Sequence, residues 1–282
     1  MKTVQIVTDS TASLDPEVIR RHDISVVPLW VQVGEESYKD GVTLSTEEFY
    51  KKLDGPVLPS TSSPPPGDFV EVYRRLAKKA KDILSIHLSR DASATCQAAE
   101  VAATSVSNEA DVTVYDSRSF SMGIGFLAME AARSAVQGLS KDQIIAKLDS
   151  LRDRVYTYVA IPTLKYLRKS GRVTQGQAIL ASILSIKPVL EIRDGIVKVV
   201  DHVRTYSGAL ARLLDLAQEK AGNVPTVVAV MHANAREEAE KFAVLVKKRL
   251  NVKELFIGEM GPVLAVHGGP GMIGIVFYND KH

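Results

Sequence analysis

The chain has 282 residues and carries 35 Lys and Arg against 33 Asp and Glu, which leaves a formal charge of +2. This near balance excludes a nucleic-acid binder that works by bulk charge, because such proteins show a pronounced basic excess. A hydrophobic fraction of 45% with 24% charged residues is typical of a globular protein and excludes a disordered or collagen-like chain.

The chain shows neither a disulfide framework nor a membrane-targeting pattern. Cys96 is the single cysteine, which excludes an intrachain disulfide and favours a cytoplasmic location. Asp9 interrupts the N-terminal apolar run before it reaches the length of a signal peptide. The longest apolar stretch, residues 178–186, is broken by Ser182 and Ser185, whereas a membrane span needs ~20 residues. We expect at most peripheral contact with a membrane.

The first half alternates short apolar runs with helical patterns. Strands are predicted at residues 4–7, 24–33, 83–88 and 112–115. Helices are predicted after the N-cap Asp15, from the capping box at residues 45–48 through Leu53, and over residues 68–80, 93–107 and 122–137. A loop rich in proline and serine, residues 55–67, interrupts the series. This alternation predicts an α/β domain with a mainly parallel sheet and helices on both faces.

The pattern changes near Arg154, after a second capping box at residues 140–143 and its helix. Residues 190–199 form two strand-like runs around Asp194-Gly195, which predicts a hairpin with antiparallel pairing. Helices are predicted at 207–221 and 235–250, and strands at 226–231, 255–257 and 273–277. We therefore predict an α/β domain over residues 1–154 and an α+β domain over residues 155–282, with a ligand cleft between them.

Four hydroxyl-rich segments precede predicted helices, and most of them directly follow predicted strands. They are residues 8–11, 60–63, 89–93 and 116–119. Such loops gather at the carboxyl ends of parallel strands, where ligands bind. Helix N-terminal amides and neutral hydroxyls together suit a small anion such as carboxylate or phosphate. The alternative is that Ser, Thr and Asp are simply the residues from which N-caps and turns are made.

The usual ATP-binding, esterase and metalloprotease motifs are absent from the sequence. It holds no Gly-x-x-x-x-Gly-Lys-Ser/Thr phosphate loop, no Gly-x-Ser-x-Gly nucleophile elbow and no His-Glu-x-x-His zinc helix. His87 lies in an apolar run and is predicted to be a packed core residue. His267 is flanked by glycine and proline, which allow a close backbone approach to a ligand and fix the imidazole. A tight turn with an incidental histidine is the alternative.

An ordered set of short motifs, spread over almost the whole chain, resembles the DegV family. The motifs are Val7-Thr8-Asp9-Ser10-Thr11-Ala12, Thr61-Ser62-Ser63-Pro64, Leu88-Ser89, Ser93-Ala94-Thr95-Cys96-Gln97, Asp116-Ser117, Ser121-Met122-Gly123-Ile124-Gly125, Gly171-Arg172-Val173, Ile186-Lys187-Pro188-Val189-Leu190 and His267-Gly268-Gly269-Pro270-Gly271. The resemblance implies a two-domain fatty-acid-binding protein, the carrier subunit of a bacterial fatty acid kinase. Such a subunit presents the carboxylate of a long-chain fatty acid to a separate ATP-using catalytic subunit, and we expect no cofactor, no metal and no ATP site in this chain.

The resemblance also implies roles for particular residues. The carboxylate-binding hydroxyls fall on Thr61 and Ser93 and the family's histidine on His267, while Arg172 matches an arginine near the mouth of the site, where a kinase partner or a transferring phosphate would be contacted. The sequence departs from the family pattern at Ser63, Pro65, Ala94, Cys96 and Ser170. The Cβ of Ala94, where glycine is usual, can shift the backbone beside the carboxylate.

Two alternative functions stay open at this point, and three basic residues have an alternative explanation. A hydrolase would use Ser93 with His267 and either Asp116 or Asp9, although a triad is recognised by its geometry and not by the presence of its residues. A phosphorylated sugar or another small anion would also suit hydroxyls at helix N-termini. The basic residues Arg168, Lys169 and Arg172 surround a predicted helix end, where complementarity to the helix dipole is a sufficient explanation for them.

Overall fold

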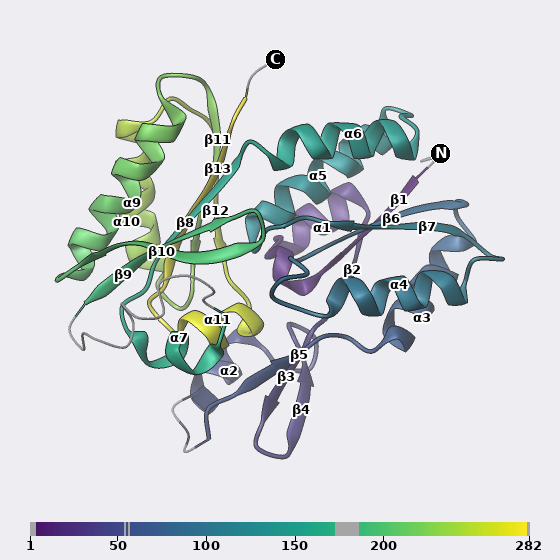
Figure 1. Cartoon of the computed structure of the whole chain (residues 1–282), viewed down its shortest axis with the longest axis horizontal. Helices are drawn as coiled ribbons and strands as arrows, with labels where there is room; N and C mark the ends of the chain where they lie inside the picture. Colours follow the sequence, from purple (N-terminus) through teal and green to yellow (C-terminus); the bar gives the residue numbers. More distant parts are fainter. Residues whose placement is uncertain (1–3, 54, 56, 173–185, 281–282) are drawn as a thin grey trace. The chain divides into compact units, whose positions relative to one another are not determined.

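The computed structural model describes residues 4–53, 55, 57–172 and 186–280 (Figure 1). Most of the apolar stretch noted at residues 178–186 therefore lies outside the described residues. Contacts divide the chain into two compact units. One comprises Met1–Ser45 with Pro59–Asp153, and the other comprises Thr46–Leu58 with Arg154–His282. Our predicted boundary counted residues 46–58 with the first domain, whereas the contacts group them with the second unit.

The first unit is built on a parallel sheet with the strand order β2-β1-β6-β7. Its strands are β1 (Val4–Asp9), β2 (Ile24–Val27), β6 (Asp82–His87) and β7 (Asp111–Asp116). Every residue of the central strand β1 is buried, as expected for a parallel strand covered on both faces. The predicted parallel α/β architecture is confirmed.

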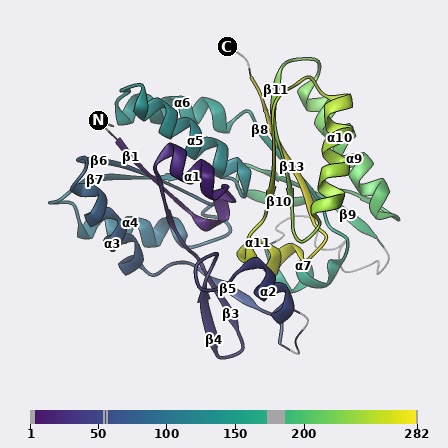
Figure 2. The same ribbon diagram turned by 180° about the vertical axis from the view of Figure 1, so that it is seen from behind.

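Helices cover both faces of this sheet. They are α1 (Pro16–His22), α3 (Pro66–Ala77), α4 (Thr95–Ser105), α5 (Met122–Val136) and α6 (Lys141–Arg152), with a short 3₁₀ helix η1 (Ser10–Ala12) after β1. α3 and α4 lie on one face, and α1, α5 and α6 lie on the other (Figures 1 and 2). The predicted caps of α1 and α6 are confirmed, because Asp15 accepts from the amide of Glu17 at 2.7 Å and Ser140 with Gln143 forms a full capping box.

The single strand predicted at residues 24–33 is wrong, because the chain forms two strands there that belong to different sheets. Pro28, which lacks an amide hydrogen, separates β2 from β3 (Trp30–Val33). β3 is the middle strand of an antiparallel sheet with β4 (Glu36–Lys39) and β5 (Ser60–Ser62). β5 falls inside the segment predicted as a loop, and it places Thr61 opposite Val31.

The second unit contains a six-stranded sheet with the order β10-β9-β8-β13-β11-β12. Its strands are β8 (Val155–Ala160), β9 (Lys187–Arg193), β10 (Ile196–Val203), β11 (Thr226–His232), β12 (Val252–Glu259) and β13 (Ile273–Asn279). All neighbouring pairs are antiparallel except β11 with β12. The predicted hairpin is confirmed, and its turn residues Asp194 and Gly195 have φ of 53° and 81°.

Within the described residues, the second unit contains five helices. They are α2 (Thr46–Leu53), α7 (Leu164–Ser170), α9 (Tyr206–Ala221), α10 (Arg236–Arg249) and α11 (Pro262–Gly268). α9 and α10 cover one face of the sheet (Figure 1) and form a core with Val228, Val230, Ile275 and Phe277 at its centre. In the part of the chain that the structure describes, no helix combines the length and the apolar character needed to cross a bilayer.

Candidate functional site

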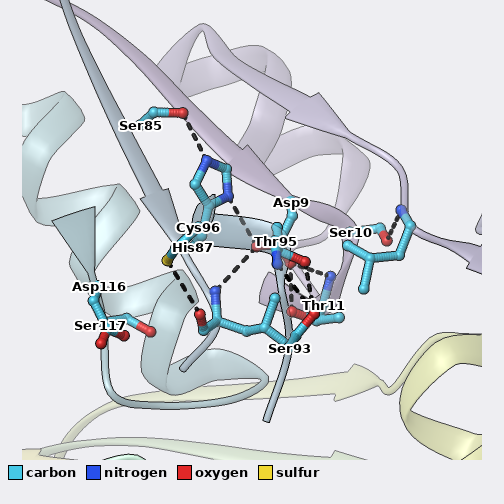
Figure 3. A network of polar contacts seen from close by, with 12 residues as sticks. Asp9, Ser10, Thr11, Ser85, His87, Ser93, Thr95, Cys96, Asp116 and Ser117 are labelled. Carbon is cyan, nitrogen blue, oxygen red and sulfur yellow. Dashed lines mark hydrogen bonds and ion pairs between the residues drawn. The ribbon is translucent and has the colours of Figure 1, made fainter. Parts of the chain in front are cut away.

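The hydroxyl-rich segments of the first unit gather at one edge of its parallel sheet. The adjacent strands β1, β6 and β7 run in the same direction and end at Asp9, His87 and Asp116. Three of the four predicted segments follow these strand ends, so their side chains lie together in Figure 3. The carboxyl edge of an open parallel sheet is the place where such folds bind ligands.

Asp9 is the centre of a buried polar network at this edge. Its Oδ1 accepts a hydrogen bond from the backbone amide of Thr11 at 3.0 Å and another from the Thr11 hydroxyl. Its Oδ2 accepts from the amide of Leu88 at 3.1 Å and lies 3.0 Å from Nδ1 of His87. Asp9 and His87 are both fully buried. These partners offset the cost of burying a carboxylate, which is high when the group is unpaired.

His87 is a core residue, as predicted, and it extends the network away from the edge. Its Nε2 lies 2.7 Å from Oγ of Ser85, and that oxygen accepts from the Tyr73 hydroxyl at 2.8 Å. Phe69 packs edge-on against the imidazole ring. The order Asp9, His87, Ser85 has the connectivity of a catalytic triad, but Ser85 is fully buried and its oxygen is engaged by Tyr73. The arrangement therefore supports the fold and offers no nucleophile to a substrate.

Ser93 lies near the end of the loop that follows β6, directly before Ala94, the N-cap residue of α4. The loop begins at the amide of Leu88, which Asp9 holds. It continues through the Ser89 amide, which donates to the carbonyl of Ser119 at 3.2 Å, and the Ser93 amide, which donates to the Ser89 carbonyl at 3.2 Å. The Ser93 side chain is partly exposed, and its Oγ lies 2.8 Å from the Thr95 hydroxyl (Figure 3). When Thr95 donates in this pair, the Ser93 proton is available to a ligand.

Thr61 is the middle residue of β5 and is also partly exposed. Successive residues of a strand face opposite sides, so Ser62 faces away from Thr61. A groove of about 540 Å³ lies on the Ser62 side, between β5 and α4. Its lining includes Trp30, Ser62, Ser63, Pro65, Ala94 and Gln97. Three of the departures from the family pattern therefore line this groove.

Asp9 and Asp116 at this edge already accept hydrogen bonds, and Cys96 is buried. Asp116 accepts from the amide of Arg118 at 2.9 Å, and Asp9 is paired as described. Cys96 is fully buried, and its burial, together with the nearby charge of Asp116, raises the pKa of its thiol to about 12. The thiol is therefore neutral at pH 7. Asp9 and Asp116, the two acids named for the hydrolase alternative, therefore both have hydrogen-bond partners within the first unit.

His267 lies in the last turn of α11, where the sequence indicated only a glycine- and proline-rich turn. Pro262 occupies the first helical position, which suits a residue without an amide hydrogen. Gly269 follows with φ of 82°, and a Cβ there would lie 2.2 Å from Cδ2 of Tyr166. Only glycine fits this close approach of α11 to α7. The helix was missed because Pro and Gly at both ends resemble loop punctuation.

The electrostatic surroundings of His267 keep its imidazole neutral at pH 7. Burial, and after it the positive charge of Arg172, together lower the pKa of His267 to about 4. A neutral imidazole offers one N–H donor and one acceptor nitrogen. His267 therefore suits a ligand that accepts a hydrogen bond.

Arg172 follows the C-terminus of α7, where a helix end was predicted. Gly171 terminates the helix in the left-handed conformation with φ of 64°, and Arg172 is exposed. Arg168 and Lys169 lie in the last turn of α7. Lys187 donates to the carbonyl of Pro162 at 2.6 Å, just before α7. Among the described residues no group of three His, Cys, Asp or Glu is arranged to hold a metal ion.

The first unit is an α/β unit with hydroxyl groups at the carboxyl edge of its sheet, where proteins of this class bind ligands. Comparison with known proteins gives the family. A family model described as "Uncharacterised protein, DegV family" matches residues 3–280. The chain belongs to the DegV family. It is 37% identical over 275 residues to a DegV domain-containing protein of Streptomyces coelicolor, with 97% of each chain covered.

Solved structures similar to this chain include fatty-acid-binding members of the family. The crystal structure of DegV from Bacillus subtilis, described as a fatty acid binding protein, has a TM-score of 0.91 and 33% identity and covers 99% of this chain and 100% of its own. A DegV family protein from Thermus thermophilus, described by its fatty acid binding, has a TM-score of 0.90, 31% identity and coverages of 98% and 99%. A stearic-acid-binding protein from Eubacterium ventriosum has a TM-score of 0.91, 27% identity and coverages of 99% and 98%.

Proposed function

We propose that this chain binds a long-chain fatty acid and presents its carboxylate to a separate ATP-dependent kinase subunit, which forms the acyl phosphate. The observation that carries the fatty acid ligand is the near full-length likeness to DegV from Bacillus subtilis, a fatty acid binding protein. The hydroxyls at the carboxyl edge of the first sheet support an anionic head group. The kinase partner rests on the family resemblance of the sequence motifs and on the absence of a recognisable nucleotide loop in the sequence.

Thr61, Ser93 and His267 are the proposed ligands of the carboxylate. The hydroxyls of Thr61 and Ser93 are partly exposed and donate without charge. His267 is neutral at pH 7 because burial and Arg172 lower its pKa, so it contributes a single N–H. Three neutral donors can satisfy a carboxylate that would otherwise be costly to bury.

The acyl chain supplies most of the affinity in this proposal. A saturated chain with ~14 buried methylenes gains on the order of 11 kcal/mol gross at ~0.8 kcal/mol each. A hydrogen bond to a charged group contributes only ~1.5–3 kcal/mol, and association costs roughly 4–15 kcal/mol. Apolar walls therefore hold the ligand, while the polar residues select and orient its head group.

The proposal is tested by measuring what the purified protein carries and what it binds. Native mass spectrometry of freshly purified protein is expected to show a retained fatty acid. After delipidation, titration with palmitate is expected to show that Thr61→Ala and Ser93→Ala each weaken binding by roughly tenfold, the lower end of one hydrogen bond to a charged group. The double variant is expected to lose less than the product of the two effects, because both hydroxyls share one partner.

A matched control comes from the same two elements. Ser62→Ala changes the other side of β5, and Ser105→Ala removes an exposed hydroxyl near the end of α4 that bonds to the Val101 carbonyl. The Ser62→Ala, Ser105→Ala double variant is expected to bind palmitate with wild-type affinity. Wild-type affinity in the Thr61→Ala, Ser93→Ala double variant contradicts the assignment. Turnover of activated esters that disappears in Ser93→Ala would instead support a hydrolase.

A further inference from the structure

The last residue of β1 and the first residue after it contact both segments that carry the proposed carboxylate-binding hydroxyls. Asp9 bonds to Leu88, where the loop leading to Ser93 begins. The hydroxyl of Ser10 accepts from the amide of Leu29 at 3.1 Å (Figure 3), directly before β3, and β3 pairs with β5 through Val31 and Thr61. Two consecutive residues thus anchor two segments that are distant in the sequence.

We propose that Asp9 and Ser10 are positioning residues that set the placement of Ser93 and Thr61, and hence the affinity of the head-group site for a carboxylate. The inference rests on the proposed function, because it assigns these two hydroxyls to one carboxylate. Two donors bind the same carboxylate productively only when their spacing matches it, and hydrogen bonds weaken steeply with poor geometry. The residues that fix the spacing therefore influence affinity without contacting the ligand.

The segment that connects the Asp9–Leu88 hydrogen bond to Ser93 is short, and hydrogen bonds hold it in place. Leu88 lies five residues before Ser93, and the intervening chain is closed by the bonds of Ala92 and Ser93 to the Ser89 carbonyl at 3.1 and 3.2 Å. The Ser89 amide is held in turn by the carbonyl of Ser119. Because these hydrogen bonds hold the intervening residues, a shift of the Leu88 amide also shifts the Ser93 hydroxyl.

The connection from Ser10 to Thr61 runs through the small antiparallel sheet of β3, β4 and β5. Leu29 is 2% exposed, and besides its bond to Ser10 its carbonyl accepts from the Asp40 amide at 2.9 Å. The paired residues Val31 and Thr61 then carry the position of β3 to β5. Because β5 pairs through only three residues, the alignment of β3 largely determines where the Thr61 hydroxyl lies.

Asp9→Asn distinguishes the two backbone hydrogen bonds that the carboxylate accepts, one from Thr11 and one from Leu88. Asp9 accepts from the Thr11 amide with Oδ1 and from the Leu88 amide with Oδ2. In asparagine an NH₂ group replaces one of these two oxygens, so one of the two amides loses its acceptor. Asparagine readily forms the local bond to the residue two positions on, so the Leu88 bond is the one expected to be lost. Ser10→Ala removes the acceptor for Leu29 and leaves Asp9 unchanged.

Palmitate titration of delipidated protein in double-mutant cycles tests the inference. Asp9→Asn is expected to weaken palmitate binding roughly tenfold, equivalent to about 1.4 kcal/mol, and to have less than about a twofold effect when Ser93→Ala is already present. Ser10→Ala is expected to lose its effect in the Thr61→Ala background and to keep most of it with Ser93→Ala. Losses that are the same in every background overturn the inference, because they indicate general weakening of the fold.

A control and a ligand-free measurement complete the design. Tyr73→Phe removes the bond to Ser85 at the far end of the same network and is expected to lower the melting temperature without changing palmitate affinity by more than about twofold. Hydrogen exchange on the ligand-free protein is expected to quicken over residues 88–93 in Asp9→Asn and not in Tyr73→Phe. Unchanged exchange there contradicts the role of Asp9, even if palmitate fails to bind the wild type and the proposed function falls. If Asp9→Asn does not fold, the Ser10→Ala cycle decides alone.

Discussion

His267 links stability to pH through its surroundings. Burial, and then the charge of Arg172, lower the pKa of His267 in the folded chain from 6.5 to about 4. Between these pH values the unfolded chain binds a proton that the folded chain does not, so the free energy of unfolding falls as pH drops from 6.5 to 4. We expect His267 to contribute a loss of at most about 3 kcal/mol over this window and nothing above pH 6.5. Urea unfolding of wild type and His267→Gln at pH 7 and pH 4.5 measures it.

The pKa of His267 is also expected to change when Arg172 is replaced. Arg172→Gln removes the smaller cause of the shift and leaves burial, so the pKa of His267 is expected to rise and still remain below 6.5. Nuclear magnetic resonance titration of the imidazole measures this change directly. An unshifted titration in Arg172→Gln would show that the two residues do not interact. In the wild type, bound palmitate is expected to raise the pKa of His267, because a nearby carboxylate favours the charged imidazole.

Among the elements, the hairpin of β9 and β10 gives a test of backbone conformation. Gly195 has φ of 81°, a region that costs a residue with a Cβ about 1–2 kcal/mol. Gly195→Ala is therefore expected to destabilise the protein by about that amount. Gly67, in the first turn of α3, is the matched control, because a Cβ there meets nothing within 4 Å and its φ is not positive. Gly67→Ala is expected to stabilise by about 0.4–1 kcal/mol, and equal effects in urea unfolding would refute the argument.

Elements whose signals are local could be predicted from the sequence. The capping box at Ser140 and the turn at Asp194-Gly195 each specify their structure within a few residues, and both are confirmed. β5 could not be predicted, because a three-residue strand made only of hydroxyl side chains has no apolar alternation and exists by pairing with β3. The role of Asp9 was likewise hidden, since its partners Leu88 and His87 lie almost eighty residues away in the sequence.

At the scale of the whole molecule, the division into units depends on contacts that no local pattern reports. α2 lies between two segments of the first unit in the sequence, yet it belongs to the second unit. Tyr50 of α2 reflects these surroundings, because burial and then the charge of Glu259, at the end of β12, raise the pKa of its phenol. The capping box at residues 45–48 indicated where this helix begins but not which unit it packs against. Thr61, Ser93, His267 and Arg172 came from the order of motifs, and their roles in binding remain predictions.

The proposed division of labour with a kinase predicts how acyl phosphate forms. The chain has no recognisable nucleotide loop, so this protein with palmitate, ATP and magnesium is expected to yield no acyl phosphate. Addition of a fatty acid kinase catalytic subunit is expected to give product. Product formed by this chain alone would contradict the carrier role.

Arg172 provides the sharper test of the partner surface, because it is exposed and yet influences His267. Arg172→Gln is expected to lower acyl-phosphate formation by the kinase mixture several-fold more than it lowers palmitate affinity, since an exposed charge acts mainly on docking or on the transferring phosphate. The difference between wild type and variant is expected to shrink at high salt, as exposed charges are screened. Palmitate titration and product assays on the same preparations measure both quantities. Equal proportional losses would place Arg172 in the ligand site, and no loss in either would reduce it to a basic helix end that complements the dipole of α7.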